Sequence, residues 1–127
     1  MSTLSVDTIQ GQTTAANVKM PAGSTLQVVS AVKTDTTVIN SATNLVGTRH
    51  YFVDTTASSV TVTFPASPSL GDTIYVSDAY GTWDTNNCIV NPNSEKINGV
   101  AGNSTLSSEY DSKEYIYIGG TAGWRTV

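Results

Sequence analysis

The amino-acid sequence predicts an all-β protein in which short antiparallel strands form a small sandwich or barrel-like module, preceded by an extended N-terminal segment. Thr, Ser and Asn occur 20, 15 and 9 times among the 127 residues. Thr is β-branched and favours strands, whereas Ser, Asn and the ten glycines favour turns. Apolar and polar residues alternate with period two in several stretches. Turn residues interrupt these stretches about every 7–12 positions, which is typical of all-β sandwiches and barrels.

The first 47 residues divide into two predicted parts. Residues 1–25 carry few apolar side chains and supply at most one short strand, so we expect an extended segment that becomes ordered against a partner. Residues 26–47 begin with an alternating stretch that predicts a half-buried strand, with Leu26, Val28 and Val32 on one face. The polar, Thr-rich residues that follow predict a connection, with room for one short strand.

Residues 48–127 form the predicted β module. Period-two stretches there predict strands of about five or six residues. These strands are centred on Tyr51–Val53, Val60–Phe64 and Ile74–Val76, with two more at Glu114–Ile118 and Trp124–Val127. Glycine-rich residues separate the last two stretches, which predicts a terminal hairpin.

The balance of charge excludes several classes of partner. Only 13% of the residues are charged, and the formal net charge is −4. Six Lys and Arg residues, spread singly, cannot form the basic surface that binds nucleic acid or an anionic membrane. No run of about 18 apolar residues predicts a transmembrane helix. Residues 1–12 lack the features of a signal peptide, so we expect a protein made and kept in the cytoplasm or released without a signal.

Few residues carry catalytic or metal-binding chemistry. Nucleophilic catalysis needs a base, and His50 is the only histidine. We interpret His50 as a surface or edge residue of a strand, although three copies near the axis of a trimer could bind a metal ion. Cys88 is the only cysteine and is interpreted as a small hydrophobic residue of a strand.

The carboxylates are candidates for a glycosidase pair, but most lie in or beside predicted turns, where such side chains bond the local backbone. Those within residues 48–127 are Asp54, Asp72, Asp78, Asp84, Glu95, Glu109, Asp111 and Glu114. We therefore expect no catalytic residue, no metal ion and no cofactor, and a small hydrolase is the least favoured interpretation.

Aromatic side chains are the remaining candidates, because their faces stack on sugars and anchor interfaces. Tyr80 and Trp83 lie in a predicted loop and form a candidate exposed recognition site. For Trp83, packing over the end of the sheet or into a neighbouring subunit is the favoured interpretation. Trp124 alternates with polar residues in the last strand and is interpreted as a core residue.

Two groups of residues resemble segments of bacteriophage proteins. About residues 43–127 resemble a β module that recurs in the fibres and other virion proteins of tailed bacteriophages. The resemblance rests on turn and strand residues: Tyr51-Phe52-Val53-Asp54-Thr55, Val60-Thr61-Val62-Thr63-Phe64-Pro65-Ala66-Ser67-Pro68, Gly71-Asp72, Asp78, Gly81-Thr82-Trp83, Thr85-Asn86-Asn87, Asn93, Lys96-Ile97-Asn98-Gly99, Leu106, Tyr115, Gly119-Gly120-Thr121 and Gly123-Trp124-Arg125. Residues 4–11 and 18–23 are similar to the N-terminal segment of structural proteins from phages of marine and freshwater bacteria.

This resemblance implies a homotrimeric virion component, assembled in the host cytoplasm, whose N-terminal segment joins it to a larger particle. About 40 residues precede the module, too few for an extended shaft, which favours a short appendage or adaptor. The hypothesis is a non-enzymatic structural protein whose partners are its own copies and other virion proteins. The residues expected to attach it are Leu4, Val6, Ile9, Val18, Met20 and Pro21.

Two alternatives remain open. The chain could be a capsid decoration protein that stabilises the shell, which differs from the first hypothesis in where the N-terminal segment binds. It could also be a carbohydrate-binding module that recognises the host surface through Tyr80, Trp83 and neighbouring loops.

Overall fold

Strands and turns, without a helix, make up the part of the chain that the computed structural model describes, residues 36–47 and 49–127. The predicted all-β class is therefore confirmed for these residues. The strands are β1 (Thr36–Ile39), β2 (Thr43–Asn44), β3 (Arg49–Val53), β4 (Val60–Thr63), β5 (Thr73–Asp78), β6 (Cys88–Asn91), β7 (Lys96–Ile97), β8 (Val100–Ala101), β9 (Ser104–Leu106), β10 (Ser112–Tyr117) and β11 (Trp124–Thr126). The strand predicted over residues 26–33 lies outside the described residues.

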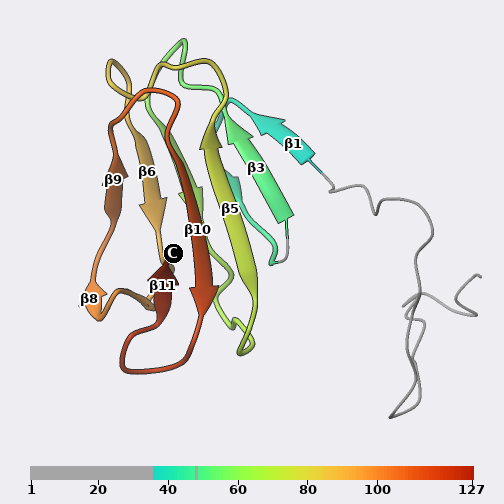
Figure 1. The fold of residues 1–127 in the computed structure, drawn as a ribbon, viewed down its shortest axis with the longest axis vertical. Coiled ribbons are helices and arrows are strands. Elements are labelled where there is room, and N and C mark those ends of the chain that lie inside the picture. Colours follow the sequence, from blue (N-terminus) through green and yellow to red (C-terminus); the bar gives the residue numbers. More distant parts are fainter. Residues whose placement is uncertain (1–35, 48) are drawn as a thin grey trace, which may run out of the picture. The chain divides into compact units, whose positions relative to one another are not determined.

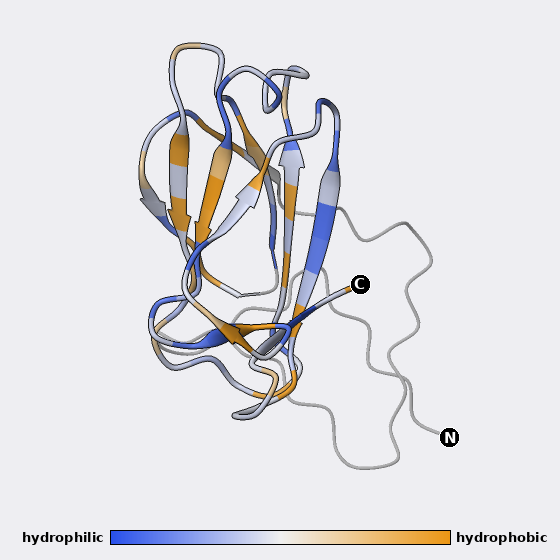
Figure 2. Cartoon of the chain, turned by 90° about the vertical axis from the view of Figure 1, so that its left-hand side faces the viewer, coloured by the Kyte–Doolittle hydropathy of each residue, from blue (hydrophilic) through white to orange (hydrophobic). Residues whose placement is uncertain are grey.

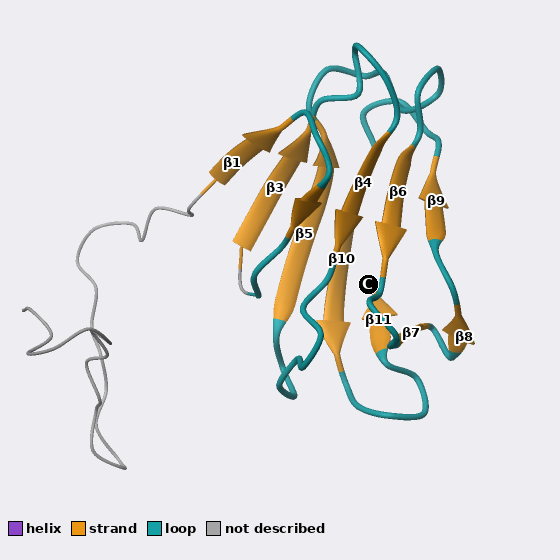
Figure 3. Ribbon diagram, turned by 180° about the vertical axis from the view of Figure 1, so that it is seen from behind, coloured by secondary structure: helices purple, strands orange, loops and turns teal. Residues whose placement is uncertain are grey.

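Two sheets face each other as a sandwich (Figure 1). One sheet, called sheet A, has the order β1-β3-β5-β10-β11-β7-β8. The other, sheet B, has the order β2-β4-β6-β9, and Figure 3 shows β4, β6 and β9 from behind. Each sheet has two free edges in the described chain, so the unit is a sandwich and not a closed barrel.

The strands are not all antiparallel, which corrects the sequence-based prediction. Five pairings are parallel, namely β1 with β3, β3 with β5, β2 with β4, β4 with β6, and β7 with β11. The cause is the path of the chain, because β1 to β6 alternate between sheets A and B. The chain crosses from one sheet to the other and back before it adds the next strand to a sheet. That strand therefore runs in the same direction as the preceding strand of the same sheet.

The final part of the chain adds antiparallel strands to both sheets. Strand β9 pairs with β6 in sheet B, and β10 pairs with β5 in sheet A. Strands β10 and β11 form the terminal hairpin that the sequence predicts, with Tyr117 opposite Trp124. Strands β1 and β2 show that residues 36–44, interpreted as part of a connection, contribute to both sheets. The compact unit spans Lys33–Val127.

The core lies between the sheets and consists of the inward members of each alternating strand. In sheet B, the parallel register of β4 and β6 places Val60 beside Cys88 and Val62 beside Val90, and all four side chains are buried. Figure 2 shows the hydrophobic residues concentrated on the strands. Three rings from different parts of the chain meet in this core: Phe64 lies edge-on to Tyr115 and to Trp124, with centroids 5.0 and 4.7 Å apart.

Candidate functional site

Three regions of the described residues hold the side chains that bear on function. One is the loop end, where connections 54–59, 79–87 and 107–111 meet (Figure 1). Another is the outer face of sheet A around His50. The third is a groove next to β9. The predicted attachment residues lie outside the described part of the chain: Leu4, Val6, Ile9, Val18, Met20 and Pro21.

The loop end separates the two aromatic residues that the sequence groups as an exposed site. Trp83 is fully buried, which corrects the expectation that it is exposed and agrees with the interpretation that it packs over the sheet end. Tyr80 is 57% exposed. Trp83 therefore cannot serve as a sugar platform on this surface.

Asp78, the last residue of β5, holds the loop end together. Its Oδ1 accepts the backbone N–H groups of Tyr80 at 3.3 Å and Gly81 at 3.0 Å, and its Oδ2 accepts those of Trp83 at 3.2 Å and Tyr110 at 3.0 Å. Burial raises the pKa of the Asp78 carboxyl and the N–H donors lower it. The donors outweigh burial, so this pKa lies below its ordinary value of 3.8. The geometry is that of a structural anchor.

A second exposed tyrosine joins Tyr80 at this end, and the sequence does not predict it there. Tyr110 lies in the β9–β10 connection with a φ of +53°. Its ring covers Gly81 so closely that a Cβ there would collide with it. The exposed aromatic pair of the loop end is therefore Tyr80 and Tyr110, 57% and 73% exposed.

Three aromatic rings form a row on the outer face of sheet A. His50 stacks on Phe52 with ring centroids 4.6 Å apart, and it lies 5.4 Å from the ring of Tyr75. The parallel register of β3 and β5 places His50 directly beside Tyr75. The pKa of the Tyr75 hydroxyl is raised because Glu114, on β10, accepts its hydrogen bond. These rings face away from the core, so the sheet presents an aromatic surface.

Two serines extend this surface as a hydrogen-bonded chain. His50 Nε2 and Ser77 Oγ share a hydrogen bond of 2.7 Å, and Ser77 Oγ and Ser112 Oγ share one of 2.6 Å. Burial lowers the pKa of His50, so the imidazole is held neutral at pH 7. A neutral histidine against a serine is a possible base and nucleophile, but Ser77 is only 6% exposed and its hydroxyl is already shared with Ser112. The arrangement joins three strands and does not present a reactive hydroxyl.

Two further carboxylates, Asp54 and Asp72, support turns. Asp54 accepts the N–H of Thr56 at 2.9 Å, and Asp72 accepts the N–H of Ser69 at 2.9 Å, as the turn interpretation predicts. Cys88 is buried, and burial raises its pKa to about 12. Within the described residues, no three His, Cys, Asp or Glu side chains are close enough to hold a metal ion.

The sequence alone indicates which residues of β3 face outward, but not which side chains of other strands lie beside them. Alternation places His50 and Phe52 opposite Tyr51 and Val53, so the outward set follows once the inward set is known. Which strands lie side by side does not follow, because it depends on the sheet order.

Compared with known proteins, the chain matches no family model, and no curated protein matches it in sequence.

Proposed function

We propose that the chain is a non-enzymatic structural component of a bacteriophage particle, a short trimeric appendage or adaptor attached through its N-terminal segment. The resemblance of residues 43–127 to a β module of phage fibres suggests this function. One structural observation supports it. The free edge of β1 and the aromatic outer face of sheet A are adjacent, and together they offer a surface for another protein chain.

Within residues 36–47 and 49–127, β1 is an edge strand that no other strand pairs with on its outer side. It is four residues long, whereas the other sheet edges in the described chain, β2, β8 and β9, have two, two and three residues. Its sequence is Thr-Thr-Val-Ile, without charge or proline. Natural proteins shorten, charge or cover such edges, because unpaired backbone groups there accept another strand.

The face next to this edge is apolar enough to favour burial. Val38 on β1 is 58% exposed, and its register neighbour Phe52 belongs to the ring row. Tyr75, on the next strand, is 38% exposed. In obligate oligomers, surfaces of this kind are buried between subunits and resemble a core cut in half. Packing of three copies through this region would cover both the edge and the rings.

Light scattering on the purified protein tests trimer formation. We expect a mass of three chains for the full sequence and also for a version that starts at Ser24. Val38→Lys should reduce the mass to that of one chain, whereas Val100→Lys, at a site 69% exposed on β8, should leave it unchanged. A monomer in both unmodified forms would contradict the trimer and favour a decoration protein that binds to a shell.

Incorporation into particles tests the structural function itself. In a phage that carries this gene, we expect the protein in gradient-purified particles at a fixed ratio to the major capsid protein, measured by quantitative mass spectrometry. Deletion of residues 1–23 should remove the protein from the particles while the β unit still folds. Its absence from purified wild-type particles would refute the proposal.

A further inference from the structure

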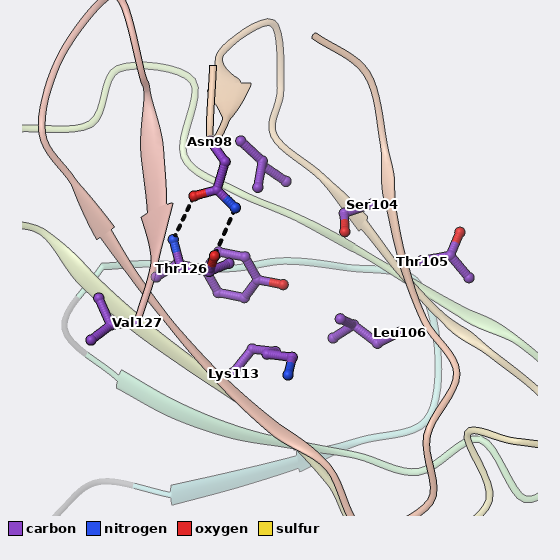
Figure 4. Close-up of a pocket in the computed structure, with 9 residues that line it drawn as sticks. Asn98, Ser104, Thr105, Leu106, Lys113, Thr126 and Val127 are labelled. Atoms are coloured by element: carbon purple, nitrogen blue, oxygen red, sulfur yellow. Dashed lines mark hydrogen bonds between the residues drawn. The ribbon is translucent and has the colours of Figure 1, made fainter. Parts of the chain in front are cut away.

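A groove runs along one side of the sandwich, where β9 of sheet B faces β10 and β11 of sheet A. Two cavities of about 350 and 240 Å³ adjoin there and share Ile97, Asn98 and Ser104 in their walls. The larger one is lined by Ile97, Asn98, Ser104, Thr105, Leu106, Lys113, Tyr115, Thr126 and Val127 (Figure 4). We call the two cavities together the side groove. The larger cavity alone is within the size range of small-molecule sites, about 300–1,000 Å³.

The side-chain amide of Asn98 joins two walls of the side groove, beside the backbone bonds from Asn98 N–H to Trp124 O and from Gly99 N–H to Ala122 O. Asn98 donates from Nδ2 to Thr126 Oγ1 at 2.7 Å, and its Oδ1 accepts the backbone N–H of Thr126 at 3.1 Å (Figure 4). The same Oδ1 accepts Arg125 Nη1 at 2.8 Å. Asn98 thereby fixes the β7–β8 turn to β11, which makes the groove a preformed feature.

Several polar groups of the groove remain available to a ligand. The side chains of Asn103 and Ser104 have no hydrogen-bond partner within the described residues. Thr126 Oγ1 accepts from Asn98 and keeps its own hydrogen to donate. Thr105 also lines the larger cavity, but its side chain is exposed on the other face of β9 from Ser104 and Leu106. The groove therefore offers two hydroxyls and one primary amide beside the apolar side chains of Ile97 and Leu106.

Tyr115 adds an independent observation. Its side chain belongs to the wall of the larger cavity, and its hydroxyl is buried without a hydrogen-bond partner in the described chain. An unpaired buried hydroxyl costs about 1–3 kcal/mol. Trp83 Nε1 and Trp124 Nε1 are buried and unpaired in the same way, so the position of Tyr115 in the cavity wall is what relates its hydroxyl to the groove.

The charges of the groove favour a neutral ligand. Lys113 is the only charged side chain among the lining residues, and its Nζ lies 3.1 Å from Asp111 Oδ2. Arg125, at the rim, is bonded to Asn98. A peptide strand is a poor fit, because β9 offers only three residues of free edge, too few for a ladder of backbone hydrogen bonds.

We propose that the side groove binds one neutral saccharide unit, free or at the end of a longer glycan. Ser104, Thr126 and Asn103 would bond its hydroxyls, and Ile97 with Leu106 would contact its apolar C–H face. This site is separate from the loop end with Tyr80 and from the outer face of sheet A. It does not depend on the particle function proposed above.

An NMR titration of the ¹⁵N-labelled full chain tests this proposal. Glucose, galactose, mannose and their neutral di- and trisaccharides are added at millimolar concentrations, with inorganic phosphate as the anionic comparison. We expect at least one sugar to cause saturable shifts in residues 97–106, 113–115 and 126. Binding by trisaccharides but not monosaccharides would assign the site to a glycan end.

Matched variants localise the binding. Ser104→Tyr fills the groove and should abolish the shifts, whereas Ser58→Tyr, in the exposed β3–β4 connection, should leave the affinity unchanged. If Ser104→Tyr fails to fold, Ser104→Ala removes one hydroxyl and should weaken binding about tenfold. The proposal is refuted if no sugar causes shifts, if only phosphate does, or if the shifts map to Tyr80 and Tyr110 instead.

Discussion

Asp78 Oδ2 accepts the backbone N–H of Tyr110 at 3.0 Å, although 32 positions separate the two residues in the chain. This bond joins the β5–β6 connection to the β9–β10 connection. The same carboxylate also fixes the backbone next to Trp83, so one side chain organises both the buried and the exposed aromatics of the loop end.

Replacement of Asp78 by Asn should lower the free energy of unfolding by about 2–4 kcal/mol, because charge-assisted bonds to buried N–H groups are lost. Urea unfolding followed by tryptophan fluorescence measures this. Asp84→Asn is the matched control, because among the described residues Asp84 bonds only the Thr85 hydroxyl, at 3.3 Å. Equal effects of the two substitutions would show that Asp78 is not an anchor.

His50 should make the protein less stable as the pH falls. Burial lowers its pKa below the ordinary value of 6.5, so the unfolded chain takes up this proton at higher pH than the folded chain does. By linkage, the stabilisation is complete above pH 6.5 and is lost as the pH falls through the folded pKa. Urea midpoints between pH 8 and pH 5 should decline less in His50→Gln than in the unmodified chain. An imidazole NMR titration with a midpoint above 6.5 would contradict this.

Gly123→Ala should destabilise the protein by about 2 kcal/mol or more, since backbone φ and space both oppose a side chain. Gly123 has a φ of +68°, and an added Cβ would collide with the backbone of Lys96, on β7. Gly120→Ala is the control, because a Cβ there meets open space and φ is not left-handed. Thermal unfolding of both variants makes the comparison. A Gly123 variant as stable as the control would argue against the close approach of the backbone to β7.

Cys88 should be inert in the folded protein. Burial raises the pKa of its thiol to about 12, so almost no thiolate is present at pH 8. An aromatic disulfide reagent should detect no thiol in the native chain and one in urea. Ser58→Cys, in an exposed loop, provides a thiol that should react at once in the native state. Rapid reaction of Cys88 in the native state would show that the core opens between β4 and β6.

The strands with the clearest alternation are predicted most accurately. The stretches around Tyr51, Val60, Ile74 and Tyr115 correspond to β3, β4, β5 and β10, because burial of one sheet face imposes period two on the sequence. Strands β7, β8 and β9 are two or three residues long and carry no period that a sequence pattern could reveal. Their existence depends on the strands beside them.

The sequence by itself determines the all-β class, the terminal hairpin and the inward residues of the longer strands. It cannot determine strand direction or neighbours, because a strand with one buried face has the same alternation whether its partner is parallel or antiparallel. Only the tertiary structure decides that strands β1 to β6 alternate between the two sheets and that Trp83 is buried while Tyr110 is exposed. It also decides that Ser104 and Thr126 line the same groove. These relationships join residues far apart in the chain, and packing of the two sheets is what brings them together.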